Sequence, residues 1–471
     1  MLFTSFTYLV FLCFAVPLVH ATRGIWRERV LLTASLVFYA AWDVRFIPVL
    51  LGVGLLTYLA GRRISAARTQ GSKRAAIVVW PIAVILCVLA VFKYTGWIAT
   101  TWNDLLPAWQ VRLPNIILPL GISFYTFECV SYLLDVYRGT AELVPFRRFL
   151  LFPAFWPHLV AGPILRIKEF GPQLDALARP GAAEVLAGID RVLIGLIKKV
   201  VIADSLATYV DAAFANAQSN SATDNWLAAI GFALQIYYDF SSYTDIAIGS
   251  ARMVGISLPE NFNLPYHFPS PTEFWNRWHM TLSRWIRDYV FFPLNLRAGA
   301  RVWLRYVYLV VVMTLVGLWH GAGIGFVLWG TWHGVLMVTH RIVQRPAARL
   351  PERWVRAVSW LGRLATLPMI VAAWILFRAH TLAEATTMLR SMFGAGSLKP
   401  AYSVNDYLML LVCVVVYFFV SPFEKRFVDR APADVDYGRW TFYVRPAVYA
   451  TGVQLLFMFD RSNVAFIYFQ F

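Results

Sequence analysis

Apolar stretches long enough to cross a lipid bilayer recur along this chain from one end to the other. A spanning helix needs about 17 to 25 mostly apolar residues. Such stretches, several of them short or interrupted, lie near residues 2–21, 29–42, 46–60, 75–93, 116–135, 186–212, 226–255, 302–320, 324–340, 357–378, 403–421 and 443–460. The pattern predicts an all-α polytopic membrane protein with about eleven spanning helices.

The remaining apolar features fit the same class. A shorter stretch at 149–164 is predicted to be re-entrant. No linker is long enough to separate soluble domains, so we expect one integral-membrane domain over residues 1–471. The stretch at 2–21 ends in a weak resemblance to a signal-peptidase site. Because no Lys or Arg precedes Arg23, we predict a retained first span instead.

The formal net charge of +16 does not indicate a nucleic-acid partner. Nucleic-acid binding needs a basic stripe on a soluble surface, whereas these Lys and Arg residues lie in short loops between apolar stretches. The loop at 61–74 is basic and lacks acidic residues, so the positive-inside rule predicts that it is cytoplasmic. Counting outward from it, the N-terminus and the C-terminal Phe471 are both predicted to be periplasmic.

Cysteines and common catalytic signatures give little further information. Cys13, Cys87, Cys129 and Cys413 lie singly within apolar stretches, without metal-ligand spacing, and we expect all four to be buried small side chains. The sequence has no Walker-type loop, dinucleotide fingerprint, His-Glu-x-x-His motif or Gly-x-Ser-x-Gly elbow. It therefore predicts neither a metal site nor a nucleotide-binding fold.

A histidine at the end of the stretch 302–320 is the first candidate for chemistry. His320 lies between Trp319 and Gly321. An imidazole is costly at bilayer depth, so its presence there suggests a function. It is also the side chain best suited to move a proton near neutral pH. The alternative is a packing histidine bonded to a neighbouring carbonyl. His333, on a Trp-rich helix, is predicted to pack.

The segment 271–288 predicts one amphipathic helix, because its apolar residues recur every three or four positions. The apolar face consists of Phe274, Trp278, Leu282, Trp285 and Tyr289. The opposite face consists of Glu273, Arg277, Met280, Arg284 and Arg287. A basic, Trp-rich helix of this kind is expected to lie in the membrane interface. His279, at the edge of the apolar face, is either functional or a capping or packing residue.

Two carboxylates interrupt the apolar stretch 226–255. Asp239 and Asp245 lie there among several hydroxyl side chains, which we expect to join helices. Carboxylates at this depth need a cationic or imidazole partner. Arg277 and His279 are the partners that we expect.

Two irregular segments complete the candidates. Asn261 and Asn263 lie in a proline-flanked connector, where their amides bind either freed backbone groups or a ligand. Residues 157–163 read as a broken helix, which is tolerated at membrane depth only beside protein or a water-filled cavity. This segment is a candidate cavity wall, and His158 within it is predicted to be structural.

Together, several blocks of the sequence resemble the membrane-bound O-acyltransferase family. The blocks are LPLGISFYTFE at 118–128, PHLVAGP at 157–163, YDFSSYTD at 238–245, ENFN at 260–263, EFWNRWH at 273–279, GLWHG at 317–321 and YFQF at 468–471. They follow one another in order over nearly the whole chain. The resemblance is closest to the bacterial branch that includes the membrane proteins of alginate O-acetylation and teichoic-acid D-alanylation.

The resemblance implies a ring of helices around a central funnel, in which a cytoplasmic acyl donor meets an acceptor from the opposite side. It implies that His320 is catalytic and that His279 is a second functional histidine. The expected supporting residues are Asp239, Asp245, Trp319, Asn261 and Asn263, with Arg277, Arg284 and Arg287 as weaker candidates for donor binding. No permanently bound cofactor is expected, because acetyl-coenzyme A or another acyl thioester would be the donor substrate.

The expected function is acetyl transfer from a cytoplasmic donor toward a periplasmic exopolysaccharide, alginate above all, in the bacterial inner membrane. The expected partners are membrane lipid, the polysaccharide and separate periplasmic acetyltransferase-type proteins. Acylation of cellulose, peptidoglycan or teichoic acid is the alternative within this class. A transporter that flips an acylated carrier and a non-catalytic scaffold are the alternatives outside it.

Overall fold

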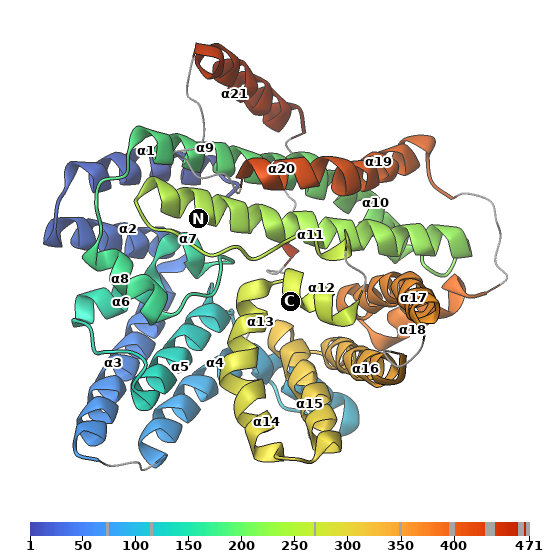
Figure 1. Cartoon of the computed structure of the whole chain (residues 1–471), viewed down its shortest axis with the longest axis horizontal. Coiled ribbons are helices and arrows are strands. Elements are labelled where there is room, and N and C mark those ends of the chain that lie inside the picture. Colours follow the sequence, from blue (N-terminus) through green and yellow to red (C-terminus); the bar gives the residue numbers. More distant parts are fainter. Residues whose placement is uncertain are drawn as a thin grey trace. The chain divides into compact units, whose positions relative to one another are not determined.

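The computed structural model describes residues 1–71, 75–113, 116–267, 270–347, 351–394, 401–428, 439–459 and 466–467. Every regular element in these ranges is a helix, as the sequence predicted (Figure 1). Two compact units divide the chain. The first comprises Met1–Ile194 and Tyr243–Pro259, and the second comprises Gly195–Ser242 and Glu260–Phe471. Helices α9 (Ala182–Ile197) and α11 (Ala222–Met253) contribute residues to both units.

The first unit contains the N-terminal helices. They are α1 (Phe6–Ala21), α2 (Ile25–Asp43), the 3₁₀ turn η1 (Val44–Phe46), α3 (Ile47–Thr69), α4 (Ala76–Leu105), α5 (Ile122–Arg138), α6 (Phe146–Ala154), α7 (Trp156–Leu159) and α8 (Ile167–Asp175). Helices α3, α4 and α5 pack against one another (Figure 1).

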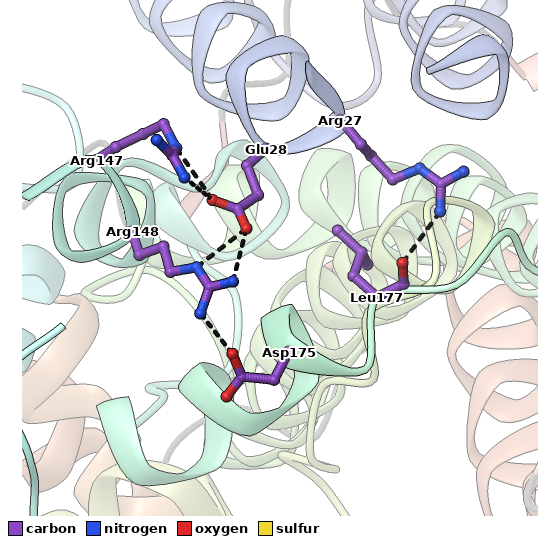
Figure 2. A network of polar contacts seen from close by, with 6 residues as sticks. All are labelled: Arg27, Glu28, Arg147, Arg148, Asp175 and Leu177. Atoms are coloured by element: carbon purple, nitrogen blue, oxygen red, sulfur yellow. Dashed lines mark hydrogen bonds and ion pairs between the residues drawn. The ribbon is translucent and has the colours of Figure 1, made fainter. Parts of the chain in front are cut away.

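A buried carboxylate joins three of these helices. Glu28 at the start of α2 accepts hydrogen bonds from Arg147 Nη2 at 2.6 Å and from Arg148 Nε at 3.0 Å, both on α6 (Figure 2). Arg148 Nη1 also donates to Asp175 Oδ1 of α8 at 2.5 Å. Charge-assisted bonds of this kind are stronger than neutral ones. They hold the amphipathic helices α6 and α8 against α2.

The structure confirms that the helix is broken near residues 157–163, as the sequence predicted. Helix α6 ends at Ala154, Phe155 leaves the helical conformation with φ −57° and ψ 108°, and α7 begins at Trp156. His158 on α7 is fully enclosed and has two polar neighbours. Its Nε2 lies 2.8 Å from the Phe152 carbonyl, and its Nδ1 lies 2.8 Å from Glu128 Oε1. These contacts support the structural role predicted for this histidine.

The second unit contains the remaining elements. They are η2 (Lys198–Ala203), α10 (Asp204–Ala215), η3 (Pro265–His267), α12 (Pro271–Arg277), α13 (Met280–Ile286), η4 (Arg287–Phe291), α14 (Phe292–Ala298), α15 (Val302–His320), α16 (Ile324–Ala347), α17 (Glu352–Arg378), α18 (Leu382–Met392), α19 (Val404–Val415), η5 (Val416–Val420), α20 (Ser421–Val428) and α21 (Arg439–Phe459). Three of them, η2, η4 and η5, are π-helical, a form that often occurs at functional sites.

Within the described ranges, five helical stretches are long and apolar enough to cross a membrane. They are Ile25–Thr69, Ala76–Leu105, Val302–His320, Glu352–Arg378 and Val404–Arg426. The other predicted stretches correspond to shorter or more polar helices, such as α5 with 17 residues and α11 with its three buried aspartates. A total of about eleven spans therefore stays a prediction.

Three boundaries predicted from the sequence are wrong. Residues 61–69, predicted to be part of a loop, form the end of α3, and α4 continues to Leu105 instead of ending at 93. The predicted loop at 380–402 contains α18. Charged and polar side chains end an apolar stretch, but arginine is a good helix former and need not end the helix. Lys73, Arg74 and Phe471, used in the orientation argument, lie outside the described residues.

The cysteine prediction is half right. Cys129 and Cys413 are buried, but Cys13 and Cys87 are exposed. The exposed pair lies beside exposed apolar side chains on α1 and α4, such as Phe14. An apolar context in a membrane protein fits a lipid-facing surface as well as an interior, because lipid tails are as apolar as a protein core.

Candidate active site

The segment 271–288 folds as two short helices, not as the single helix that its periodicity predicted. Helix α12 ends at Arg277 and α13 begins at Met280. Between them His279 adopts the left-handed conformation, with φ 42° and ψ 55°. The apolar face itself is buried as predicted, because the side chains on both sides of the break are enclosed: Phe274, Trp278, Leu282, Trp285 and Tyr289.

A left-handed backbone is uncommon for a residue other than glycine and costs about 1–3 kcal/mol. Such strain persists only where the surroundings enforce it, and it clusters at active sites. Asn261 provides that enforcement. Its backbone carbonyl accepts from Met280 N at 2.9 Å, and its side-chain Oδ1 accepts from Thr281 N at 3.2 Å and from Thr281 Oγ1 at 2.9 Å. Of the two roles left open for Asn261, the structure thus supports the bonding of freed backbone groups.

The same amide sets the tautomer of His279. The His279 Nδ1 lies 3.0 Å from Asn261 Oδ1. This atom must be the amide oxygen, because a backbone N–H also donates to it. Burial lowers the pKa of His279 to about 3, so the ring is neutral. A neutral ring that donates from Nδ1 carries its lone pair on Nε2, and this nitrogen is then able to accept a proton.

Two histidines that are far apart in the sequence meet here. The ring centroids of His279 and His320 are 6.4 Å apart. Both side chains are buried, with 0% and 4% exposure respectively. Trp319 lies beside both rings, at 6.2 Å from His279 and 4.9 Å from His320. Phe240 of α11 meets the His279 ring edge-on at 4.8 Å. The structure thus brings His279, His320 and Trp319 into one aromatic cluster.

Glycines allow the approach that positions His320. This residue ends α15, and Gly321 caps the helix in an extended conformation. A Cβ at Gly321 would overlap the Phe326 ring, and a Cβ at Gly317 would overlap the Phe326 carbonyl. Helices α15 and α16 pack closely as a result (Figure 1). Small residues at helix interfaces let backbones approach in this way in membranes.

Asp239 has a different partner from the ones predicted. Lys199 Nζ on η2 lies 2.7 Å from Asp239 Oδ1 and 2.6 Å from Asp204 Oδ1, and all three side chains are buried. The backbone N–H of Ile467 donates to Asp239 Oδ2 at 2.7 Å. The expectation that Arg277 or His279 pairs with this carboxylate is therefore wrong.

Asp245 lies in the first unit and pairs there with a cation. Arg191 Nη2 on α9 donates to Asp245 Oδ1 at 2.8 Å, and both residues are buried. A cationic partner was expected for this carboxylate, but not this one. The pair joins α9 to the end of α11.

The three arginines proposed for donor binding contact protein groups. Arg277 forms the predicted i,i+4 pair with Glu273, at 3.4 Å. Arg277 Nη1 also donates to the carbonyl of Asn263, and Arg284 Nη2 donates to the carbonyl of Glu260. Arg287 Nε lies 2.8 Å from the carboxylate of its neighbour Asp288.

His333 packs as predicted. It is fully buried, and it stacks on Phe274 with ring planes at 10°. Its ring also meets Trp275 and Trp329 at 5.2 Å and 4.9 Å. Neither ring nitrogen has a hydrogen-bond partner among the described residues.

Lys199 is one of the buried ionic residues that sequence reasoning missed. Its signal was present, because Lys198 and Lys199 lie within the predicted span 186–212, where a charged side chain suggests a buried partner. Lys198 in turn pairs with Glu424 of α20 at 2.6 Å.

Comparison with known proteins identifies the family. A model of the membrane-bound O-acyltransferase family matches residues 91–377, more than half of the chain. The chain belongs to that family. The resemblance noted in the sequence is thereby confirmed, and this membrane protein is an O-acyltransferase.

Relatives of this O-acyltransferase cover most or all of its length. A probable alginate O-acetylase of Pseudomonas aeruginosa is 40% identical, over 93% of this chain and 85% of the relative. One from Azotobacter vinelandii is 36% identical over 100% of both chains. A peptidoglycan O-acetyltransferase of Helicobacter pylori is 30% identical, over 98% of this chain and 94% of its own.

Proposed function

We propose that this O-acyltransferase moves acetyl groups from a cytoplasmic thioester toward an exopolysaccharide, most directly alginate. The observation that carries the proposal is the meeting of the His279 and His320 rings at 6.4 Å in a buried cluster. Alginate is chosen as the acceptor because the relatives named as alginate O-acetylases include one that is 40% identical.

In the proposed reaction His320 is the general base. It takes the proton of an acceptor hydroxyl as the oxygen attacks the thioester carbonyl carbon. A carbon–oxygen bond forms, the carbon–sulfur bond breaks, and the leaving thiolate takes the proton back from the imidazolium. Acid–base assistance of this kind contributes about 10²–10⁴-fold to a rate. No resident cofactor or metal is needed, because acetyl-coenzyme A or another acyl thioester supplies the acyl group.

The other residues of the cluster have positioning roles in this proposal. His279 Nε2, with its lone pair set by Asn261, orients the acceptor hydroxyl or relays its proton. Trp319 fixes both rings by contact. Asn263 supports the break at His279, since its backbone N–H donates to Arg277 O at 2.9 Å.

The more distant supporting residues have weaker roles. Asp239 and Asp245 act through the helices that their ion pairs join, and not by contact with substrate. Arg277 and Arg284 are the candidates for contact with the donor's phosphates, since guanidinium groups suit phosphate oxygens.

We also propose a location and partners. The protein would lie in the bacterial inner membrane, with residues 61–74 cytoplasmic and both termini periplasmic, because the basic residues concentrate in that segment. Separate periplasmic acetyltransferase-type proteins would receive the acetyl group and complete its transfer to the polymer.

The test is complementation of a bacterium that secretes alginate but lacks its own alginate O-acetylase. The chain should restore base-labile acetate on the secreted alginate. His320→Ala should remove it while the protein remains folded and inserted, and the matched control His380→Ala, at an exposed histidine, should keep it. Near-normal acetate with His320→Ala would favour a transporter or a scaffold. Acetate on peptidoglycan instead of alginate would overturn the acceptor but not the chemistry.

A further inference from the structure

A cavity of about 240 Å³ lies in the second unit, and neither His279 nor His320 is among the residues that line it. One wall is a single face of α15, formed by Leu309, Val312, Met313 and Val316. These positions follow the i, i+3, i+4, i+7 pattern of one helical face. The opposing wall includes Leu282 of α13, and the lining is largely aliphatic and aromatic.

Some of the residues that line the cavity are accessible from outside the protein. Phe292, which lines it, is 49% exposed. Helix α15 is a candidate membrane span, and its other side carries the exposed residues Val307, Val311 and Leu315. Apolar side chains exposed on a spanning helix face lipid. Helix α15 therefore faces lipid on one side and lines the cavity on the other.

The charged residues of the lining are both cationic. They are Arg287 on η4 and Arg341 on α16, and the uncharged polar residues Asn276 and Ser283 accompany them. Arg287 is half-exposed, with 52% of its side chain accessible, although it also contacts Asp288. A second apolar cavity of the same unit, lined by residues such as Ile230 and Val371, has no charged lining residue. The pairing of apolar walls with two guanidinium groups thus distinguishes the first cavity.

We propose that this cavity binds an anionic phospholipid, with one acyl chain against α15 and the phosphate bonded by Arg287 and Arg341. Basic pockets between membrane helices recognise anionic headgroups in this way. The walls argue against the pantetheine arm of a thioester donor, because its amides would lose their hydrogen bonds in an aliphatic cavity. An acyl chain has no such groups. The proposal does not depend on the catalytic roles of His279 and His320.

Native mass spectrometry of the purified full-length protein tests this. The probes are dioleoyl phosphatidylglycerol and dioleoyl phosphatidylcholine, titrated into a neutral detergent. Phosphatidylglycerol should bind more tightly, and Arg287→Gln with Arg341→Gln should weaken it by about 10-fold or more, since each charged hydrogen bond contributes about 1.5–3 kcal/mol. The matched control Arg297→Gln, at an exposed arginine of α14 outside the lining, should leave binding unchanged.

A second variant tests the apolar wall. Met313→Trp should fill the cavity and weaken binding of both lipids. If the Met313→Trp protein does not elute as a folded protein, Leu309→Phe is used in its place. Equal binding of the two lipids, or an unchanged affinity in the double arginine variant, would overturn the proposal. Displacement of phosphatidylglycerol by acetyl-coenzyme A would overturn it in favour of a donor site. Because the readout is lipid binding, a failed acetylation assay does not bear on it.

Discussion

The second unit contains two buried polar clusters that are held by different forces, and the adjacent residues Asp239 and Phe240 of α11 belong to one cluster each. At Asp239, one lysine compensates two carboxylates at 2.6 Å and 2.7 Å. At His279, the contacts are the Asn261 amide and aromatic rings, among them the Phe240 ring. In the first cluster, two carboxylates share one cation. The second holds neutral imidazoles in fixed positions.

This difference separates a cluster that stabilises the fold from a cluster that is able to accept a proton. Buried ions that are paired and hydrogen-bonded stabilise a particular arrangement, and the removal of one partner is costly. A neutral imidazole with a defined tautomer can accept a proton during a reaction. The sequence grouped Asp239 with the histidines as parts of one site. The structure instead makes Lys199–Asp239 a brace and assigns His279 and His320 to a common cluster.

The largest effect is expected from breaking the brace. Lys199→Met leaves Asp204 and Asp239 buried without their cation, which should lower the free energy of unfolding by about 3–5 kcal/mol. Thermal unfolding in detergent measures this. Acetyl transfer per folded molecule should change much less than stability does. The control is Arg356→Gln, which removes an exposed i,i+4 pair with Glu352 and should cost under about 0.5 kcal/mol. A similar small loss for Lys199→Met would remove the distinction between the clusters.

The next largest effect concerns the imidazole cluster. Asn261→Ala removes the oxygen that accepts from Thr281 and from His279. Unpaired buried donors cost about 1–3 kcal/mol, and if this cost raises the barrier, acetyl transfer slows by about 5- to 150-fold. Asn261→Asp retains an acceptor oxygen and should lose less.

The rate of acetyl transfer by the purified protein measures the effect of Asn261→Ala. The control Asn216→Ala changes an exposed asparagine that donates to the Ala212 carbonyl, and it should keep the wild-type rate. A full rate in Asn261→Ala would show that the tautomer and backbone of His279 do not matter for the reaction.

The smallest effect is expected at the third buried histidine of the unit. His333→Phe replaces a ring that stacks on Phe274 by another ring of similar shape. Because no described residue bonds its nitrogens, the change should alter stability by less than about 1.5 kcal/mol and leave the acetyl-transfer rate nearly unchanged. A large loss of rate would instead place His333 in the reaction and extend the cluster to three histidines.

The spacing of apolar residues predicted features that depend only on nearby residues, such as the face of a helix that is buried. The buried face of 271–288 follows from residues three or four apart, and it persists across the break. The break itself was not predictable, because the chain resumes the helix with the same face inward after His279. The cost of its left-handed backbone is offset by Asn261, which is 18 residues earlier in the sequence. Local periodicity contains no information about such a partner.

The spacing of residues also did not predict which residues, distant along the chain, become partners in the fold. A buried aspartate implies a cation, but several cations were compatible with Asp239, and the sequence does not rank Lys199 above Arg277. The meeting of His279 with His320 was expected from the family resemblance and not from spacing, since 41 positions separate them. The YFQF block at 468–471 lies outside the described residues, although Ile467 just before it bonds Asp239.

The central claim is that His279 and His320 act together in one reaction, and a double-mutant cycle tests it most directly. Acetyl-transfer rates are measured for wild type, His279→Ala, His320→Ala and the double variant, each confirmed as folded. The account predicts a loss of about 10²–10⁴-fold for His320→Ala, with the double variant little worse, because residues that act as a unit are not additive. Losses that multiply, or a near-normal rate for His320→Ala, would contradict it.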